Sequence, residues 1–226
     1  MEARDQDGLP DQMLFLSISK EFIAFVNRQK GVYVDACAGF AENKRVVGRQ
    51  AFRVMKEGGY KSDEPGKQVV LHTWAHDESH PDNVTNHITL ASSFTEANSI
   101  HGSNSQQVCK SIVVFIFAYW DEEVRPKLAR SICVANKQIR SDIMGDIRLL
   151  RNDILHNKSV MSEESHRRLT TIAELFVPGQ PIVFYHSTMN EIFKKINRGV
   201  AYMLRDCIGM QLPPDADKII SLAIRG

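Results

Sequence analysis

The sequence predicts a mainly α-helical protein that also contains one small β-hairpin. Apolar residues recur at three- and four-residue spacing along most of the chain, which is the period of an amphipathic helix. Between residues 68 and 91 the pattern changes to β-branched residues on both sides of a polar turn, which favours two strands. We place a boundary in the segment SIHGSNSQQ, near residue 100, because Gly, Ser and Asn favour a hinge. This divides the chain into an extension over 1–100 and a helical domain over 101–226.

The extension is expected to contain two helices and the hairpin. Its elements, in chain order, are a frayed terminus at 1–9, helices at 11–29 and 40–57, and strands at 68–74 and 87–91. We expect the first helix to end at Gly31, since glycine is unfavourable inside a helix. Gly58 and Gly59 supply the residue type that commonly ends a helix, and they predict the end of the second.

The C-terminal domain is expected to be mostly helical. Its helices are expected at 104–123, at 136–157, from Ser162 to a point before Pro178, at 188–207, and in a short segment after Pro213. Ser162 is a suitable N-cap because Glu163 and Glu164 follow it in the first turn, where acidic groups favour the helix dipole. Thr188 and Glu191 have the spacing of a capping box.

Composition and charge exclude several classes of protein. The formal charge is +1, so contact with a nucleic acid would depend on local clusters such as 44–53 and 125–151 rather than on an overall basic field. The four cysteines contain no Cys-x-x-Cys pair, which argues against a zinc knuckle or a disulfide framework. The longest apolar run, 112–120, is too short to cross a bilayer. No signal pattern opens the chain, so we expect a soluble, cytoplasmic protein without a membrane partner.

The helix predicted at 136–157 has two organised faces. When each residue advances by roughly 100° from Arg151, the apolar side chains fall between roughly 240° and 320°. These are Ile139, Ile143, Ile147, Leu150 and Ile154. Arg148, Asn152 and His156 fall at roughly 60°, 100° and 140° on a second face. Gly145 also lies on that face, where we expect it to let another helix approach closely.

The second face carries residue types that can act on a phosphodiester. Histidine can transfer a proton to or from a ribose hydroxyl or a leaving oxygen near neutral pH. Arginine can hold a phosphate through two hydrogen bonds and a permanent charge. The pattern leaves one alternative open, which is a polar face in solvent, with His156 favoured near the helix C-terminus by the dipole.

The segment Arg151-Asn152-x-x-x-His156 resembles the Arg-polar-x(3–5)-His motif of the HEPN superfamily. Its surroundings resemble that family as well, because a helix ending in Tyr119 and Trp120 precedes the motif helix and two more helices follow it. The resemblance covers roughly residues 101–210. It implies an antiparallel four-helix bundle for this domain, and it assigns nothing to residues 1–100.

The resemblance also implies an activity. HEPN proteins are usually homodimers whose motif helices meet across a two-fold axis, and active members cut RNA without a metal ion or cofactor. By this likeness Arg151 stabilises the phosphate, His156 is the general acid and base, and Asn152 orients them. Arg148 and Lys158 are further candidates for contact with RNA. Many members are toxins or anti-phage effectors, so an antitoxin or regulatory partner is expected. The alternative is a catalytically inactive HEPN module that binds RNA or protein as a dimer.

The sequence departs from one HEPN toxin group in a single respect. In that group a tyrosine stands two residues after the motif histidine and is adenylylated by a partner enzyme. Here that position is Lys158. Control by that route is therefore not expected in this protein.

Two further sets of polar residues have simpler interpretations. A loose cluster contains His72, His76, His80 and His87, with Asp77, Glu78 and Asp82 nearby. His-x-x-x-His would suit a metal ion on a helix, but a strand and a turn do not keep that spacing. We therefore expect histidines that line a cleft or lie in a loop, rather than a metal site. Asp142 and Asp146 are expected to form ion pairs with Arg140 or Arg148, and the alternative is that they contribute to the active cleft.

Overall fold

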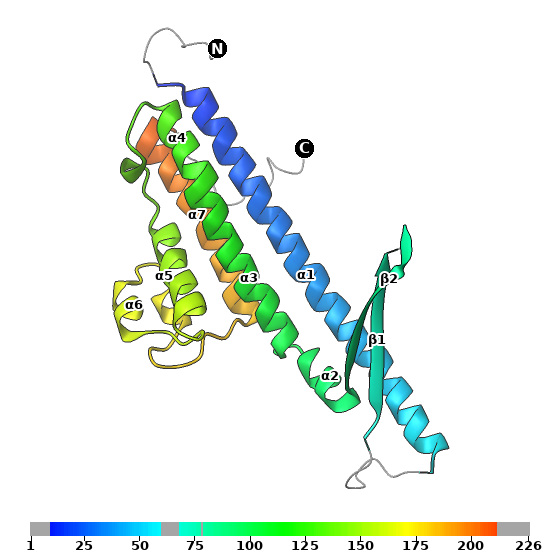
Figure 1. Ribbon diagram of the computed structural model, residues 1–226. Coiled ribbons are helices and arrows are strands. Elements are labelled where there is room, and N and C mark those ends of the chain that lie inside the picture. Colours follow the sequence, from blue (N-terminus) through cyan, green and yellow to red (C-terminus); the bar gives the residue numbers. More distant parts are fainter. Residues whose placement is uncertain (1–9, 60–67, 78, 212–226) are drawn as a thin grey trace. The chain divides into compact units, whose positions relative to one another are not determined.

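The computed structural model of the protein describes residues 10–59, 68–77 and 79–211. Over these residues it is mainly helical, with one antiparallel two-stranded sheet (Figure 1). The prediction of a mainly α-helical chain with a small hairpin is therefore confirmed. The frayed terminus predicted at 1–9 and the short helix predicted after Pro213 lie outside the described residues.

The chain separates into two compact units. The helical unit contains the described residues 10–33 and 109–211, and the hairpin unit contains those between 34 and 108. The second of these boundaries falls close to the one expected near residue 100. The boundary after residue 33 was not expected, because residues 10–33 were assigned to the extension but belong to the same unit as the later helices.

Helix α1 runs without interruption from Gln12 to Glu57. The predicted break at Gly31 is wrong, because a glycine costs roughly 1 kcal/mol inside a helix but does not forbid helical backbone. Tyr33, in the turn after this glycine, is 7% exposed, and its ring centroid lies 5.6 Å from that of His186, at the start of α7 (His186–Ile208). Packing thus fixes α1 beyond the glycine. The end of the helix is as predicted, since Gly59 adopts a left-handed φ of 70°.

Strands β1 (Val70–Asp77) and β2 (His80–Leu90) form the predicted hairpin in the hairpin unit. Their pairing begins at Val70 and Leu90 and shifts register once, before the pair formed by Asp77 and His80. Both strands extend into the segment expected to be a polar turn, because backbone pairing continues where the side chains give no alternating pattern. Helix α2 (Ala91–Ala97) follows β2 directly.

Helix α3 (Ser103–Tyr119) begins after Gly102, where a Cβ would lie 2.3 Å from main-chain oxygens of α2, so only glycine fits. It continues through a π-helical turn (Trp120–Val124) into α4 (Arg125–Ser131). Within the helical unit, the Phe22 ring of α1 lies 5.2 Å from that of Trp120, and the Phe25 ring lies 4.1 Å from that of Tyr119. These aromatic contacts join the first part of α1 to the end of α3.

Helix α5 (Asp142–His156) carries the motif and is shorter than predicted. The segment 136–141, expected to be its first part, is a short 3₁₀ turn (Asn136–Gln138) followed by extended backbone. Ser141 is the N-cap residue of α5, with φ −149° and ψ 117°. Serine is favoured at that position, so Ser141 and the acidic Asp142 mark a helix start that the periodicity of the flanking apolar residues obscured.

Two helices complete the helical unit. Ser162 caps α6 (Glu163–Arg168) as predicted, and its hydroxyl oxygen accepts a hydrogen bond from the Ser165 backbone at 3.1 Å. The helix ends well before Pro178, and a short 3₁₀ turn (Ala173–Leu175) follows. Helix α7 begins at His186, so the predicted capping box at Thr188 is wrong. Thr188 is 4% exposed and lies inside the helix, which ends at the left-handed Gly209.

The core of the helical unit lies among α1, α3, α5 and α7. Its largest fully buried side chains include Phe15, Phe22, Ile116, Ile147, Leu150, Met189 and Ile192. Helices α5 and α7 approach closely, since a Cβ on Gly199 would lie 2.5 Å from Ile143 Cγ2. No helix among the described residues is long and apolar enough to cross a membrane.

Candidate functional site

Helix α5 presents the predicted site residues on its open side. Ile147 and Leu150 are fully buried, which confirms the predicted apolar stripe. On the opposite side Arg151 and Asn152 are half-buried, and His156 is exposed in the last turn. The two faces deduced from helical periodicity are therefore present in the folded chain, and the packing of one orients the other.

The fold leaves most of the hydrogen-bonding capacity of these three side chains unused. Arg151 donates one hydrogen bond from Nη1 to Asn152 Oδ1, at 3.0 Å. His156 has no hydrogen bond or ion pair with any residue that the structure describes, and nothing there joins it to Arg151. One copy of the chain thus places Arg151 and His156 on either side of Asn152 without a hydrogen bond between them.

The same face includes residues beyond the motif. Arg148 and Gly145 are exposed, and a Cβ on Gly145 would meet no described atom within 4 Å. Leu155 is 49% exposed between the polar side chains. The sequence analysis missed Leu155, although its position at roughly 40° in the helical projection places it between Arg151 and Arg148. An apolar side chain in the middle of a cationic face is an unusual feature for a purely solvated helix.

The turn after α5 is held by backbone and carboxylate contacts. Lys158 is exposed and, like Ser159, has a positive φ, at 50° and 60° respectively. The Ser159 backbone donates to Asp153 O at 3.1 Å, and the Ser162 backbone donates to Asp153 Oδ2 at 2.9 Å. These bonds fix the unusual turn in which Lys158 follows the motif histidine. Lys158 therefore extends from a defined position, although no described partner holds its side chain.

Asp146 has a different role from the one predicted. It is 1% exposed and forms no ion pair with Arg140 or Arg148; its carboxylate accepts hydrogen bonds from the backbones of Thr170, Thr171 and Ile172 instead. The hydroxyls of both threonines donate to it as well. The predicted pairing is wrong because the three adjacent N–H groups satisfy a buried carboxylate without a cation. Asp142 is exposed and pairs with neither arginine among the described residues.

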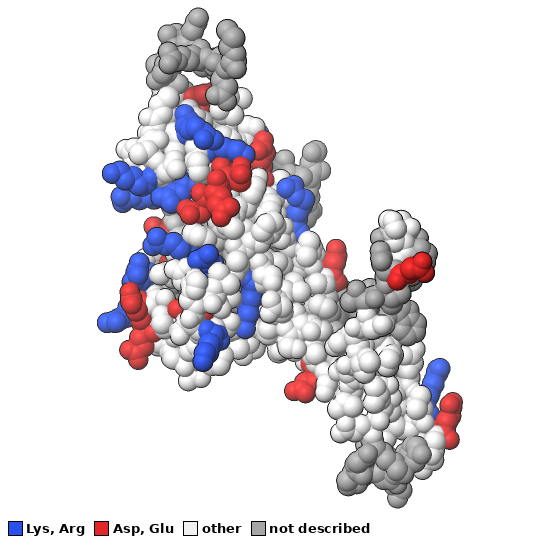
Figure 2. Space-filling view, in the orientation of Figure 1, with Lys and Arg blue, Asp and Glu red and all other residues white. Residues whose placement is uncertain are grey.

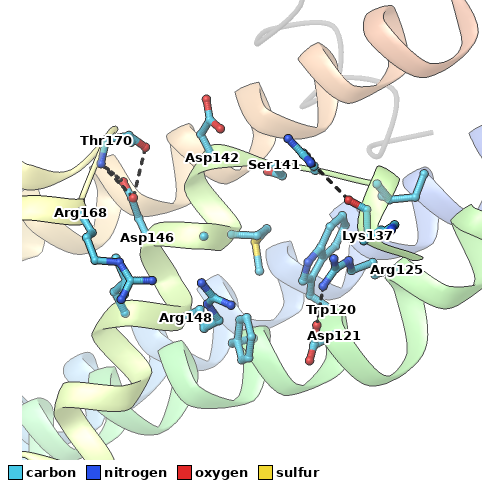
Figure 3. Close-up of a pocket in the computed structure, with 16 residues that line it drawn as sticks. Trp120, Asp121, Arg125, Lys137, Ser141, Asp142, Asp146, Arg148, Arg168 and Thr170 are labelled. Carbon is cyan, nitrogen blue, oxygen red and sulfur yellow. Dashed lines mark hydrogen bonds and ion pairs between the residues drawn. The ribbon is translucent and has the colours of Figure 1, made fainter. Parts of the chain in front are cut away.

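A hollow of about 410 Å³ lies beside the N-terminal half of α5 (Figure 3). Arg148 and Arg168 reach it from α5 and α6, while Arg125 and Lys137 lie at its other end (Figure 3). Arg140 also lines it. In Figure 2, Lys and Arg side chains gather, with acidic ones among them, over the part of the helical unit that contains α4, α5 and α6. The hollow is thus a cationic depression next to the motif face.

The histidine cluster of the hairpin does not assemble into a metal site within the described side chains. His72, His80 and His87 are exposed, and no group of three His, Cys, Asp or Glu among the described residues is placed to hold a metal ion. The side chains of residues 73–78 lie outside this description. All four cysteines are free thiols, and burial raises the pKa of the Cys207 thiol.

Comparison with known proteins adds no relative to these observations. The chain matches no family model, no curated protein and no solved structure.

Proposed function

We propose that this protein is a metal-independent endoribonuclease of the HEPN type. The observation that carries the proposal is the open face of α5, which holds Arg151, Asn152 and His156. Among the described residues, the only hydrogen bond of these three side chains is the one between Arg151 and Asn152. Apart from the one hydrogen bond between Arg151 and Asn152, the donors and acceptors of the guanidinium, the amide and the imidazole are available to bind a substrate or to transfer protons. The packing of the opposite face in the core holds them on a rigid helix, as a preorganised site requires.

The proposed reaction uses the nucleophile that RNA itself carries. The ribose 2′-oxygen attacks the adjacent phosphorus, the bond from phosphorus to the 5′-oxygen breaks, and the products are a 2′,3′-cyclic phosphate and a free 5′-hydroxyl. Imidazole at His156 takes the proton from the 2′-hydroxyl or gives one to the leaving 5′-oxygen. The guanidinium of Arg151 stabilises the charge that develops on the phosphate oxygens, and Asn152 orients these groups. No step needs a metal ion.

The complete site is proposed to form in a homodimer. Arg151 and His156 lie roughly 140° apart around α5, so one copy of the helix does not direct both side chains at the same phosphate, and a second copy is needed to supply the other group. A second copy related by a two-fold axis would bring its His156 to Arg151 of the first copy and its Arg151 to His156 of the first, so the dimer would hold two such pairs. Exposed Leu155 would supply apolar contact there, and Gly145 would allow close approach. In this proposal α1, α3, α5 and α7 form the four-helix bundle, with α1 as a member that the resemblance did not include.

Cleavage in the presence of EDTA tests the proposed activity. Arg151→Ala and His156→Ala should each lower the cleavage rate by about a hundredfold or more, because each removes a group that acts in the transition state. Arg167→Ala is the matched control, since Arg167 is an exposed arginine on α6 that lies outside both the motif and the hollow. The products should carry a cyclic phosphate, which mass spectrometry detects.

Two results would contradict the proposed activity. The first is a wild-type protein that leaves structured and unstructured RNAs intact, and the second is a pair of motif variants that cut as fast as the control. RNA binding without cleavage would favour the alternative of an inactive HEPN module. A role as a toxin or defence effector, restrained by an antitoxin or regulatory partner, is part of the same proposal.

A further inference from the structure

We propose that the cationic hollow beside α5 binds the phosphodiester backbone of the RNA strand that enters the motif face. This inference rests on the proposed function, because it takes RNA as the substrate of the helix next to the hollow. It assigns Arg168, Arg140 and Lys137, which lie outside the motif, as contacts to the substrate.

The charges that line the hollow are not balanced by the protein. Five cationic and three acidic side chains surround it. Asp121 accepts a hydrogen bond from Arg125 at 3.1 Å, Asp146 is buried and accepts from the N–H groups of 170–172, and Asp142 is exposed. None of these three carboxylates forms an ion pair with a described cation of α5 or α6. Arg148 and Lys137 have side chains with no described partner. Five cations and three carboxylates leave a net positive charge on this concave surface, which favours an anionic ligand.

The remaining cations are also able to turn towards a ligand. Arg168 meets only Glu164, at 3.4 Å, and both side chains are more than half exposed, so this pair contributes little. Arg140 donates a single hydrogen bond, to Lys137 O at 3.3 Å, which leaves its two terminal nitrogens for another acceptor. A guanidinium binds a phosphate through two such nitrogens. Phosphate groups therefore match the chemistry of both side chains.

The hollow favours the backbone of a nucleic acid over its bases. Trp120 in its wall is 3% exposed, so its ring cannot serve as a platform for base stacking. The second aromatic residue, Phe117, is half-buried. Recognition would then depend on phosphates and carry little information about base identity. We accordingly expect the hollow to add affinity for RNA of any sequence.

Arg148 links the hollow to the motif. It lines the hollow and also belongs to the exposed face of α5, one turn before Arg151 and Asn152. The helix rises by roughly 12 Å between Arg148 and His156, so the two places are close enough for one short strand to occupy both. A strand with its scissile phosphate at the motif would therefore place its neighbouring phosphates over the hollow.

Binding of a fluorescent single-stranded RNA, measured by anisotropy in the full-length His156→Ala background, tests this assignment without cleavage. Adding Arg140→Ala together with Arg168→Ala should weaken binding by about tenfold or more and lower the slope of log affinity against log salt by roughly 0.7 per lost contact. Adding Arg167→Ala instead, on the same helix but outside the hollow, should change the affinity little. If the protein with Arg140→Ala and Arg168→Ala binds RNA as tightly as the protein with Arg167→Ala, the assignment is overturned.

Two further arms separate the possible outcomes. If Arg140→Ala with Arg168→Ala weakens the binding of inorganic phosphate but leaves the affinity for RNA unchanged, the hollow is a free-anion site and the assignment to RNA fails. In the cleaving protein, the hollow variants should raise KM and leave kcat unchanged. RNA that binds through Arg140 and Arg168 but is not cut would sustain this inference and contradict the proposed activity. Hollow variants that cleave RNA with an unchanged KM would contradict this inference and support the proposed activity.

Discussion

Asp146 is the residue that ties the motif helix to the segment after α6. Its carboxylate is 1% exposed and accepts from three backbone N–H groups, with Thr171 N at 2.6 Å. Asp146→Ala should leave those donors unsatisfied and lower the free energy of unfolding by about 3 kcal/mol. Asp153→Ala removes only the two bonds from Ser162 and should lower it by about 1–2 kcal/mol. Urea denaturation of the two variants measures the difference, and an Asp153 variant that loses more stability would contradict it.

The polar residues of the motif differ from these carboxylates in one physical respect. Asp146 and Asp153 are buried and their carboxylates accept hydrogen bonds from backbone N–H groups, whereas His156 is exposed and has no described partner. The sequence could not separate the two classes, since all these residues lie outside the apolar stripe and burial depends on what later segments cover. Helical periodicity placed Arg151, Asn152 and His156 correctly on one open side. The role of Asp146 depends on Thr170 and Thr171, which are too distant in the chain for such a pattern to reveal.

At the scale of elements, two glycines make a matched test of how α5 packs. On Gly199 of α7 a Cβ would lie 2.5 Å from the buried Ile143, so Gly199→Ala should lower the free energy of unfolding by about 1–3 kcal/mol despite the better helix propensity of alanine. On Gly145 a Cβ meets open space, so Gly145→Ala should stabilise the monomer by up to about 1 kcal/mol. Thermal unfolding at low protein concentration compares them. Equal shifts in the same direction would contradict the close contact between α5 and α7.

Local signals predicted some elements and failed for others. Ser162 with its acidic neighbours, Gly59 and the hairpin were correctly identified, because each depends on a few adjacent residues. The continuation of α1 through Gly31 was not predicted, because tertiary packing outweighed the weak helix-breaking effect of one glycine. The start of α5 was not predicted either, because the apolar periodicity continues on both sides of it. The hollow could not be predicted either, because its cations come from α4, α5, α6 and the turn before α5.

At the scale of the whole molecule, the exposed Leu155 makes the proposed dimer testable. Leu155→Lys would place a positive charge opposite the arginines of a second copy, and burying an unpaired charge costs several kcal/mol, so dimer affinity should fall by at least about tenfold. Val177→Lys is the control, because Val177 is 63% exposed and lies in the segment between α6 and α7. Sedimentation at several concentrations distinguishes the variants. A wild-type protein that remains monomeric at micromolar concentration would contradict the dimer.

Mixing two inactive variants tests whether the site is shared between copies. Arg151 and His156 flank Asn152 on one helix and form no hydrogen bond with each other, so each proposed site combines Arg151 of one copy with His156 of the other. A heterodimer of Arg151→Ala and His156→Ala then retains one intact pair. After exchange of subunits at equal concentration, cleavage should recover to about a quarter of the wild-type rate, because half of the dimers are mixed and each has one of two sites. If both groups act from the same copy, the mixture stays as inactive as its components, and the composite site is wrong even where each variant alone abolishes cleavage.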